Sequence, residues 1–146
     1  MTVLAWDSKI LAADKMALQG DTQKRVTKIF KLASGGQVVG FTGDLDLGLV
    51  LLEWYQSGAD RKAFPKQRDE KEAWGVLVVA GRDGCFFYER YGVAIPVEDH
   101  FMAWGAGREA AIGAMEMGAN AIQAVAVASK WVSGCGHGCD WFAINQ

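Results

Sequence analysis

The sequence predicts an α+β protein in which antiparallel strands form the interior and helices gather on the outer faces. Short apolar segments of strand length are separated by turn residues, and the elements run in the order strands, helix, strands, two helices and a final strand. The chain has 146 residues, of which 51% are hydrophobic and 22% charged, and this composition is typical of a globular protein. We therefore expect one domain over residues 1–146.

The first half of the chain is expected to supply four strands and one helix. Alternation of apolar and polar residues over 24–32 places Lys28 on a face that it shares with apolar side chains, which is unusual for a surface lysine. A tight turn at 7–9 joins the first two strands, and the segment "ASGG" turns the chain before the fourth. The expected elements are strands over 2–6, 9–13, 24–32 and 37–43, and a helix over 44–57.

The second half is expected to complete the sheets and to cover them. The charged segment 59–72 contains Pro65 and is interpreted as a surface loop at the rim of an interface. Gly118 separates two Ala-rich helices. The expected elements are strands over 73–80, 85–90, 93–96 and 100–105, helices over 107–118 and 120–132, and a closing strand over 140–145.

Composition also limits the partners and the compartment. The net charge of -2 argues against a nucleic-acid partner, and no apolar run is long enough to cross a bilayer. Three cysteines do not suit a disulfide framework, so a cytoplasmic location is expected. The high hydrophobic content, with six tryptophans, leaves room for the interface of a homo-oligomer.

Thr2 stands directly behind Met1 and in front of the first strand. Such a threonine is either a β-favouring residue at the start of a strand or a nucleophile that is exposed by removal of one residue. Three features favour the nucleophile. Asp14 ends the second strand beside the N-terminus, Lys28 lies on an apolar face, and Gly43 stands at a strand-to-helix junction, where a backbone N–H can point at an oxyanion.

These residues lie in segments that resemble a known family over nearly the whole chain. The segments are "TVLAW" with "ILAADK", "VTKIF", "VVGFTGD" and "MAWGAGREAAIGAME". They resemble the N-terminal nucleophile (Ntn) hydrolases, in particular proteasome β subunits and HslV-type peptidases. The short first hairpin is similar to that of short proteasome-like proteins encoded by phages and prophages. The resemblance implies a four-layer α-β-β-α sandwich with two stacked antiparallel sheets.

The resemblance also implies a chemistry. Thr2 is expected to attack a peptide carbonyl of a polypeptide substrate, and its own α-amine is expected to take the proton once Met1 is removed. By resemblance, Lys28 lowers the proton affinity of this centre, Asp14 holds Lys28 in place, and the Gly43 N–H binds the oxyanion. Ser133 is a further supporting residue. No cofactor is implied. Such a peptidase would work as a ring of identical subunits, in a host cytoplasm or, if phage-encoded, in a virion.

Departures from the family pattern support an alternative function. Ala106 stands between the glycines where the family usually has a serine, and Lys130 stands near the position of a family aspartate. Retention of Met1 would leave Thr2 with an amide in place of its amine. The alternative is a catalytically inactive subunit that keeps the fold for a structural or assembly role.

The segment "CGHGCD" is a second candidate site. Cys135, His137 and Cys139 are soft ligands close in sequence, but their spacing matches no known zinc pattern. We therefore expect no metal and interpret the segment as a Gly-rich loop. A local disulfide between Cys135 and Cys139 would require an oxidising compartment.

Overall fold

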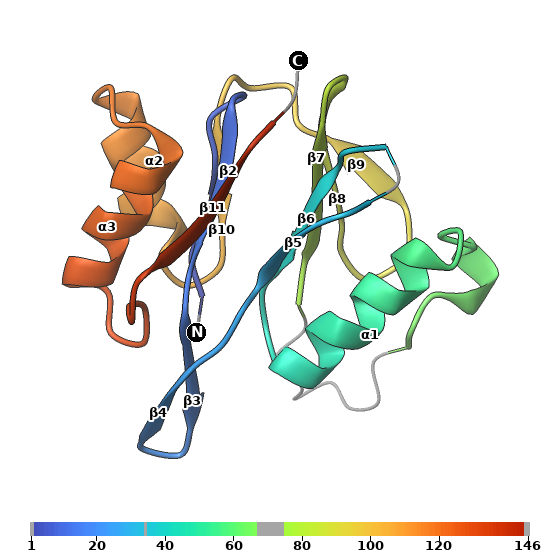
Figure 1. The fold of residues 1–146 in the computed structure, drawn as a ribbon, viewed down its shortest axis with the longest axis horizontal. Coiled ribbons are helices and arrows are strands. Elements are labelled where there is room, and N and C mark those ends of the chain that lie inside the picture. Colours follow the sequence, from blue (N-terminus) through green and yellow to red (C-terminus); the bar gives the residue numbers. More distant parts are fainter. Residues whose placement is uncertain (1, 34, 67–74, 145–146) are drawn as a thin grey trace.

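The computed structural model describes residues 2–33, 35–66 and 75–144. It confirms the α+β class and the four-layer arrangement (Figure 1). One sheet has the strand order β10-β1-β2-β11 and a second has the order β5-β6-β7-β8-β9, and all of their pairings are antiparallel. Helices α2 and α3 cover the first sheet, and α1 covers the second.

The elements follow the predicted order, with one additional hairpin, β3–β4. The strands are β1 (Leu4–Trp6), β2 (Ile10–Asp14), β3 (Met16–Gln19), β4 (Thr22–Arg25), β5 (Ile29–Lys31), β6 (Val38–Phe41), β7 (Leu77–Gly81), β8 (Gly84–Tyr88), β9 (Ala94–Pro96), β10 (Met102–Trp104) and β11 (Cys139–Ala143). The helices are α1 (Leu45–Gln56), the short 3₁₀ helix η1 (Arg61–Ala63), α2 (Arg108–Glu116) and α3 (Ala121–Trp131).

Alternation along the central strands divides the core into three layers. Val3, directly before β1, and Ala5 on β1 face α2 and α3, whereas Leu4 and Trp6 face the second sheet. On β7, Val78 faces the first sheet and its neighbours face α1. The layer under α2 and α3 is rich in small side chains, and this lets the two helices approach the sheet closely: Ala5, Ala12, Ala103, Ala111, Ala121, Ala124 and Ala128.

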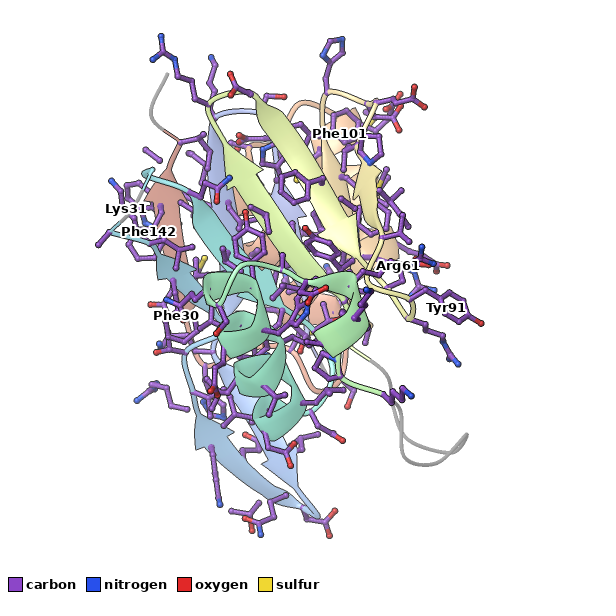
Figure 2. All side chains as sticks on the ribbon, turned by 90° about the vertical axis from the view of Figure 1, so that its right-hand side faces the viewer. Phe30, Lys31, Arg61, Tyr91, Phe101 and Phe142 are labelled. Atoms are coloured by element: carbon purple, nitrogen blue, oxygen red, sulfur yellow. The ribbon has the colours of Figure 1, made fainter. Side chains whose placement is uncertain are left out.

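Helix α1 lies across the second sheet and packs on it through a glycine. Gly48 is buried on the inner face of α1, and an added Cβ there would lie 2.0 Å from Cδ1 of Phe41. Phe41 in turn stacks on Phe30, with ring centroids 6.2 Å apart, and Phe30 is visible beside α1 in Figure 2. The contact between α1 and β6 therefore depends on the absence of a side chain at Gly48.

The prediction of one continuous strand over 24–32 is wrong. Residues 16–25 form the hairpin β3–β4, which extends beyond the sheets in Figure 1, and β5 begins only at Ile29. Gly20, with φ +58°, and Asp21 form the hairpin turn. All four residues of β4 are exposed, so this strand has no apolar face for an alternation pattern to reveal.

The first turn of the chain also fixes a helix. Asp7 Oδ1 accepts hydrogen bonds from the amides of Lys9 and Ile10, and its Oδ2 accepts one from the Ala121 amide at the start of α3. The Asn120 side chain and the Gln123 side chain complete a capping box at the same helix end. One turn residue thus joins the β1–β2 hairpin to α3.

The charged segment 59–72 is only partly a surface loop. Residues 67–72 lie outside the described residues, but η1 and the buried Phe64 belong to the fold. The Trp54 ring meets the Phe64 ring edge-on, with centroids 4.8 Å apart. Within the described ranges, no helix is long and apolar enough to cross a membrane.

We predict opposite effects of alanine at two helical glycines. Gly48→Ala should lower the free energy of unfolding by about 1–3 kcal/mol, because the new methyl group overlaps Phe41. Gly113→Ala in α2 should raise it by up to about 1 kcal/mol, because the space around Gly113 is open and alanine favours a helix. Urea unfolding of both variants measures the difference, and equal effects would contradict the packing of α1 on β6.

Candidate active site

Asp14 is the centre of the candidate site and is fully buried. Its Oδ1 accepts hydrogen bonds from the Val3 amide at 3.1 Å and from Lys28 Nζ at 2.8 Å. Its Oδ2 accepts the amides of Gly136 at 3.1 Å and Met16 at 3.3 Å. Four hydrogen bonds from four separate places in the chain thus compensate a carboxylate that has lost its water.

Lys28 reaches Asp14 from the segment that joins β4 to β5. Its side chain is 4% exposed and forms an ion pair with Asp14. Burial lowers the pKa of the Lys28 ammonium below its ordinary value, and the charge and hydrogen bond of Asp14 oppose this shift. The ion pair joins Lys28 to Asp14, as expected from the sequence. The burial of Lys28 follows from this crossing segment, however, and not from a place on the face of a regular strand.

Thr2 lies two residues before β1 and is held in place by its own backbone. Its carbonyl accepts the Gly107 amide at 3.1 Å, and an added Cβ at Gly105 would lie 2.2 Å from the same oxygen. A Cβ at Gly107 would lie 2.7 Å from that of Val3. Both glycines of the "GAG" segment are therefore required for the close approach of this turn to the N-terminal strand.

Thr2, Lys28 and Gly43 line one small cavity of about 100 Å³. Gly43, with φ +89°, stands between β6 and α1, as the sequence predicts. Among the residues that the structure describes, none accepts a hydrogen bond from the Gly43 amide. Residues that carry a hydroxyl, an ammonium and a backbone donor thus line one cavity, and attack on a carbonyl uses groups of these kinds.

The remaining sequence candidates lie apart from this cavity. Ser133 is exposed in the turn after α3 and is not among the described residues that line the cavity. Ala106 is also exposed. Lys130 is exposed on α3, with Nζ 5.2 Å from the centroid of the Trp131 ring. The two departures from the family pattern therefore lie at the surface.

The segment 135–139 contributes to the site in a way that the sequence analysis did not predict. The Gly136 amide donates a hydrogen bond to Asp14. The Gly136 carbonyl accepts a hydrogen bond from the Lys15 amide at 2.9 Å. Three consecutive residues have positive φ: Gly136 (+151°), His137 (+61°) and Gly138 (+100°). The alternating glycines of "CGHGC" were the signal in the sequence, since they permit a backbone that presents an amide inward.

The cysteines of this segment are free thiols in the structure. Cys135 is buried close to Asp14 and Lys28, and burial raises the pKa of its thiol to about 11. The thiol is therefore protonated at neutral pH and is a poor nucleophile. No group of three or more His, Cys, Asp or Glu side chains within the described ranges is arranged to hold a metal ion.

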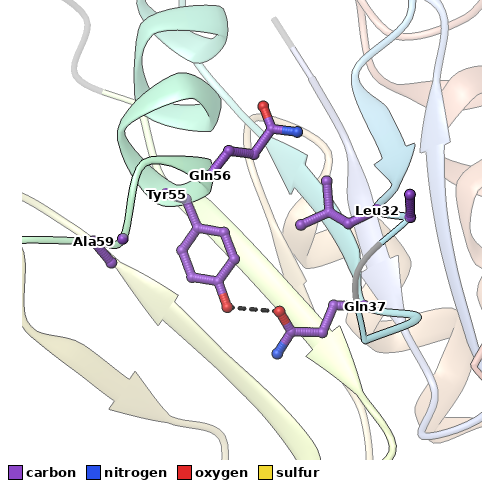
Figure 3. A pocket seen from close by; sticks show the side chains of 7 residues that line it. Leu32, Gln37, Tyr55, Gln56 and Ala59 are labelled. Carbon is purple, nitrogen blue, oxygen red and sulfur yellow. Dashed lines mark hydrogen bonds between the residues drawn. The ribbon is translucent and has the colours of Figure 1, made fainter.

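A larger cavity of about 450 Å³ lies at the other end of α1. Tyr55 donates a hydrogen bond to Gln37 Oε1 at 2.7 Å across it, as Figure 3 shows. None of the residues singled out by the sequence lines this cavity. The candidate site is therefore the small cavity at Thr2, where the predicted residues converge.

Comparison with known proteins establishes the class of fold. No protein-family model and no curated protein matches the sequence significantly. Among solved structures, BPH of Thiobacillus denitrificans in complex with epoxomicin is 18% identical, with a TM-score of 0.76 over 99% of this chain and 98% of that one. A further structure of the same BPH is 19% identical, with a TM-score of 0.75 over 99% and 98% of the two chains.

The particular fold is that of HslV. Eukaryotic HslV from Trypanosoma brucei is 16% identical, with a TM-score of 0.74 over 99% of both chains. Identities this low establish the fold alone. The likeness confirms the predicted resemblance to HslV and the four-layer sandwich of the Ntn-hydrolase type, and it covers nearly the whole chain.

We predict that removal of one partner of the buried ion pair destabilises the fold more than removal of both charges. Lys28→Met should lower the free energy of unfolding by about 3 kcal/mol, because it leaves the buried Asp14 carboxylate without its cation. Lys28→Met combined with Asp14→Asn should recover part of this loss, since no charge then remains while one acceptor is kept. Denaturant unfolding measures both variants.

The matched control is Lys31→Met. Lys31 is exposed on β5, so its loss should change the free energy of unfolding by less than about 0.5 kcal/mol. An effect of Lys28→Met as small as that of Lys31→Met would contradict the burial of the pair.

Proposed function

We propose that this protein is a threonine peptidase of the HslV type, with Thr2 as the nucleophile after removal of Met1. One observation carries the proposal: Thr2 lines the same small cavity as Lys28, whose ammonium is paired with the buried Asp14. The HslV fold supports it, because the proposed site belongs to the segments on which the resemblance rests.

The reaction would be acyl transfer to a hydroxyl. The Thr2 Oγ attacks the carbonyl carbon of a peptide bond, and its proton passes to the α-amine of Thr2. The Gly43 amide donates a hydrogen bond to the oxyanion of the tetrahedral intermediate. The C–N bond then breaks, and the leaving amine takes the proton. Water hydrolyses the resulting ester and restores the hydroxyl.

Lys28 and Asp14 would act on this reaction through charge. The Lys28 ammonium lowers the proton affinity of the nucleophilic centre, and the low dielectric of a buried site strengthens that effect. Asp14 holds the ammonium in place, and its other hydrogen bonds fix the carboxylate in turn. The cysteine beside them is a poor candidate nucleophile, because its thiol stays protonated at neutral pH.

A catalytically inactive structural subunit is the second candidate function. It is favoured by the hydrogen bonds of Asp14 to Val3, Met16 and Gly136, which would hold the fold together in an inactive protein as well. Ala106 and Lys130, which replace polar groups of the family pattern, point in the same direction. The two candidates differ in whether Thr2 has a free amine and reacts.

In either role we propose assembly into a homo-oligomeric ring. Apolar side chains are exposed on two outer helices: Leu45, Leu49 and Val50 on α1, and Val127 and Trp131 on α3. Groups of exposed apolar residues of this kind mark interaction surfaces. Native mass spectrometry of the full chain should therefore give a mass several times 15.8 kDa.

The test of activity is covalent labelling of Thr2. We expect a protein whose intact mass lacks Met1 to react stoichiometrically with epoxomicin, the compound present in the structure of Thiobacillus denitrificans BPH. Thr2→Ala should abolish labelling, because the attacking hydroxyl is lost. Cys135→Ala should retain it, because that thiol is not the nucleophile. Intact-mass spectrometry measures the extent of labelling in the wild-type chain and in both variants.

Two outcomes would contradict the proposed peptidase activity. One is a mass that includes Met1 in the purified protein, which leaves Thr2 without an amine. The other is a chain that lacks Met1 but stays unmodified by epoxomicin and by a β-lactone, and that result would favour the structural subunit.

A further inference from the structure

The β3–β4 hairpin forms part of the wall of the small cavity at Thr2. Met16, Ala17 and Leu18 of β3 line this cavity. The hairpin extends beyond both sheets (Figure 1), and all four residues of its second strand are exposed. Apolar packing of β4 therefore contributes little to holding this part of the wall in place.

His137 supplies polar contacts to the exposed strand β4. Its ring Nε2 lies 2.9 Å from Gln23 Oε1, and the ring nitrogen is the donor because a carboxamide oxygen only accepts. The His137 carbonyl accepts a hydrogen bond from Arg25 Nε at 3.3 Å. Among the described residues, the side-chain hydrogen bonds that β4 makes outside the hairpin all go to His137.

The two residues of β4 that contact His137 are paired with wall residues of β3. Gln23 is the register partner of Leu18, and Arg25 is that of Met16. Paired strands move together, because backbone hydrogen bonds and cross-strand side-chain contacts join them. A shift of β4 away from His137 would therefore also shift the wall of the cavity.

The backbone of His137 has a conformation that residues other than glycine rarely adopt. Its φ of +61° lies in the left-handed region, where a histidine is less stable than a glycine would be. The preceding residue, Gly136, donates its amide to Asp14 Oδ2 at 3.1 Å. Strained residues persist where their surroundings fix them, and the contacts to β4 fix this one. His137 thus links the segment that binds Asp14 to the hairpin.

We infer that His137 is a positioning residue of the proposed active site. Its ring and carbonyl hold the β3–β4 hairpin against the segment 135–139, so that the hairpin keeps its place beside Thr2 and Lys28. The inference rests on the proposed peptidase function and adds to that site a residue that acts on ligand binding and not on the chemical step. His137 is not among the described residues that line the cavity, so it acts through the hairpin.

The experiment removes the contact between His137 and Gln23 in the full chain that lacks Met1. Labelling of Thr2 is followed by intact-mass spectrometry over a range of epoxomicin concentrations, which separates the half-maximal concentration from the maximal rate. We expect Gln23→Ala to raise the half-maximal concentration at least about threefold, as loss of one net hydrogen bond would, and to leave the maximal rate within about twofold. Gln23→Glu keeps an acceptor oxygen and should stay close to the wild-type chain.

A control variant and a second measurement show where the effect arises. Thr22→Ala changes an exposed residue of β4 that makes neither contact to His137, so it should leave both labelling parameters unchanged. Hydrogen exchange measured by mass spectrometry does not depend on peptidase activity. The amides of the hairpin should exchange faster in Gln23→Ala than in the wild-type chain or in Thr22→Ala.

A double-mutant cycle tests the contact itself. His137→Gly removes the ring and relieves the backbone strain. If the ring acts through Gln23, then Gln23→Ala should raise the half-maximal concentration no further in a chain that already carries His137→Gly.

The outcomes separate this inference from the function on which it rests. Labelling parameters or hairpin exchange in Gln23→Ala equal to those of the wild-type chain, or a fall in the maximal rate alone, overturn the inference and leave the peptidase standing. Additive effects of His137→Gly and Gln23→Ala overturn it as well, because the two side chains then act independently. Failure of epoxomicin to label Thr2 in a wild-type chain that lacks Met1 refutes the peptidase, and the inference with it.

Discussion

The buried carboxylate of Asp14 is the constraint on which the rest of this structure depends. It binds the Val3 amide of the N-terminal strand, the Met16 amide at the start of the β3–β4 hairpin and the Gly136 amide before β11. Its fourth partner, Lys28, belongs to the segment that crosses from that hairpin to the second sheet. Because a buried carboxylate needs donors in place of its lost water, segments as far apart in the chain as Val3 and Gly136 must meet at one point.

In the proposed peptidase, the same ion pair would have both a structural and a chemical role. A well-packed pair of apolar residues would often stabilise a core as well as a buried ion pair does, so stability alone gives little reason for a lysine at position 28. In the proposed peptidase, a fixed positive charge in the cavity that Thr2 lines gives a better reason, since it would act on the proton affinity of the nucleophile. The chemistry and the assembly of the two sheets are therefore difficult to separate by mutation of either partner alone.

Much of the fold could be predicted because its central strands and helices bury apolar faces with a clear period. The pairing of Asp14 with Lys28 could be predicted for a related reason: a long cation among apolar side chains needs a partner, and the opening hairpin returns one to it. The hairpin β3–β4 could not be predicted in this way, because its second strand is wholly exposed. The hydrogen bond from the Gly136 amide to Asp14 was not predicted either. Every residue type except proline has a backbone amide, so the only signal in the sequence is the glycines that orient this one.

The position of Thr2 depends more on small residues than on polar ones. Gly105 and Gly107 allow their turn to lie directly against the backbone of β1, and the alanines of α3 let that helix cover the same strand. Strand β1, which follows Thr2, is thus enclosed on one face by α2 and α3 and on the other by the second sheet. By contrast, Ala106 and Lys130, where the family pattern has polar groups, are exposed. Neither side chain takes part in the hydrogen bonds that join Asp14 to Val3 and to Lys28.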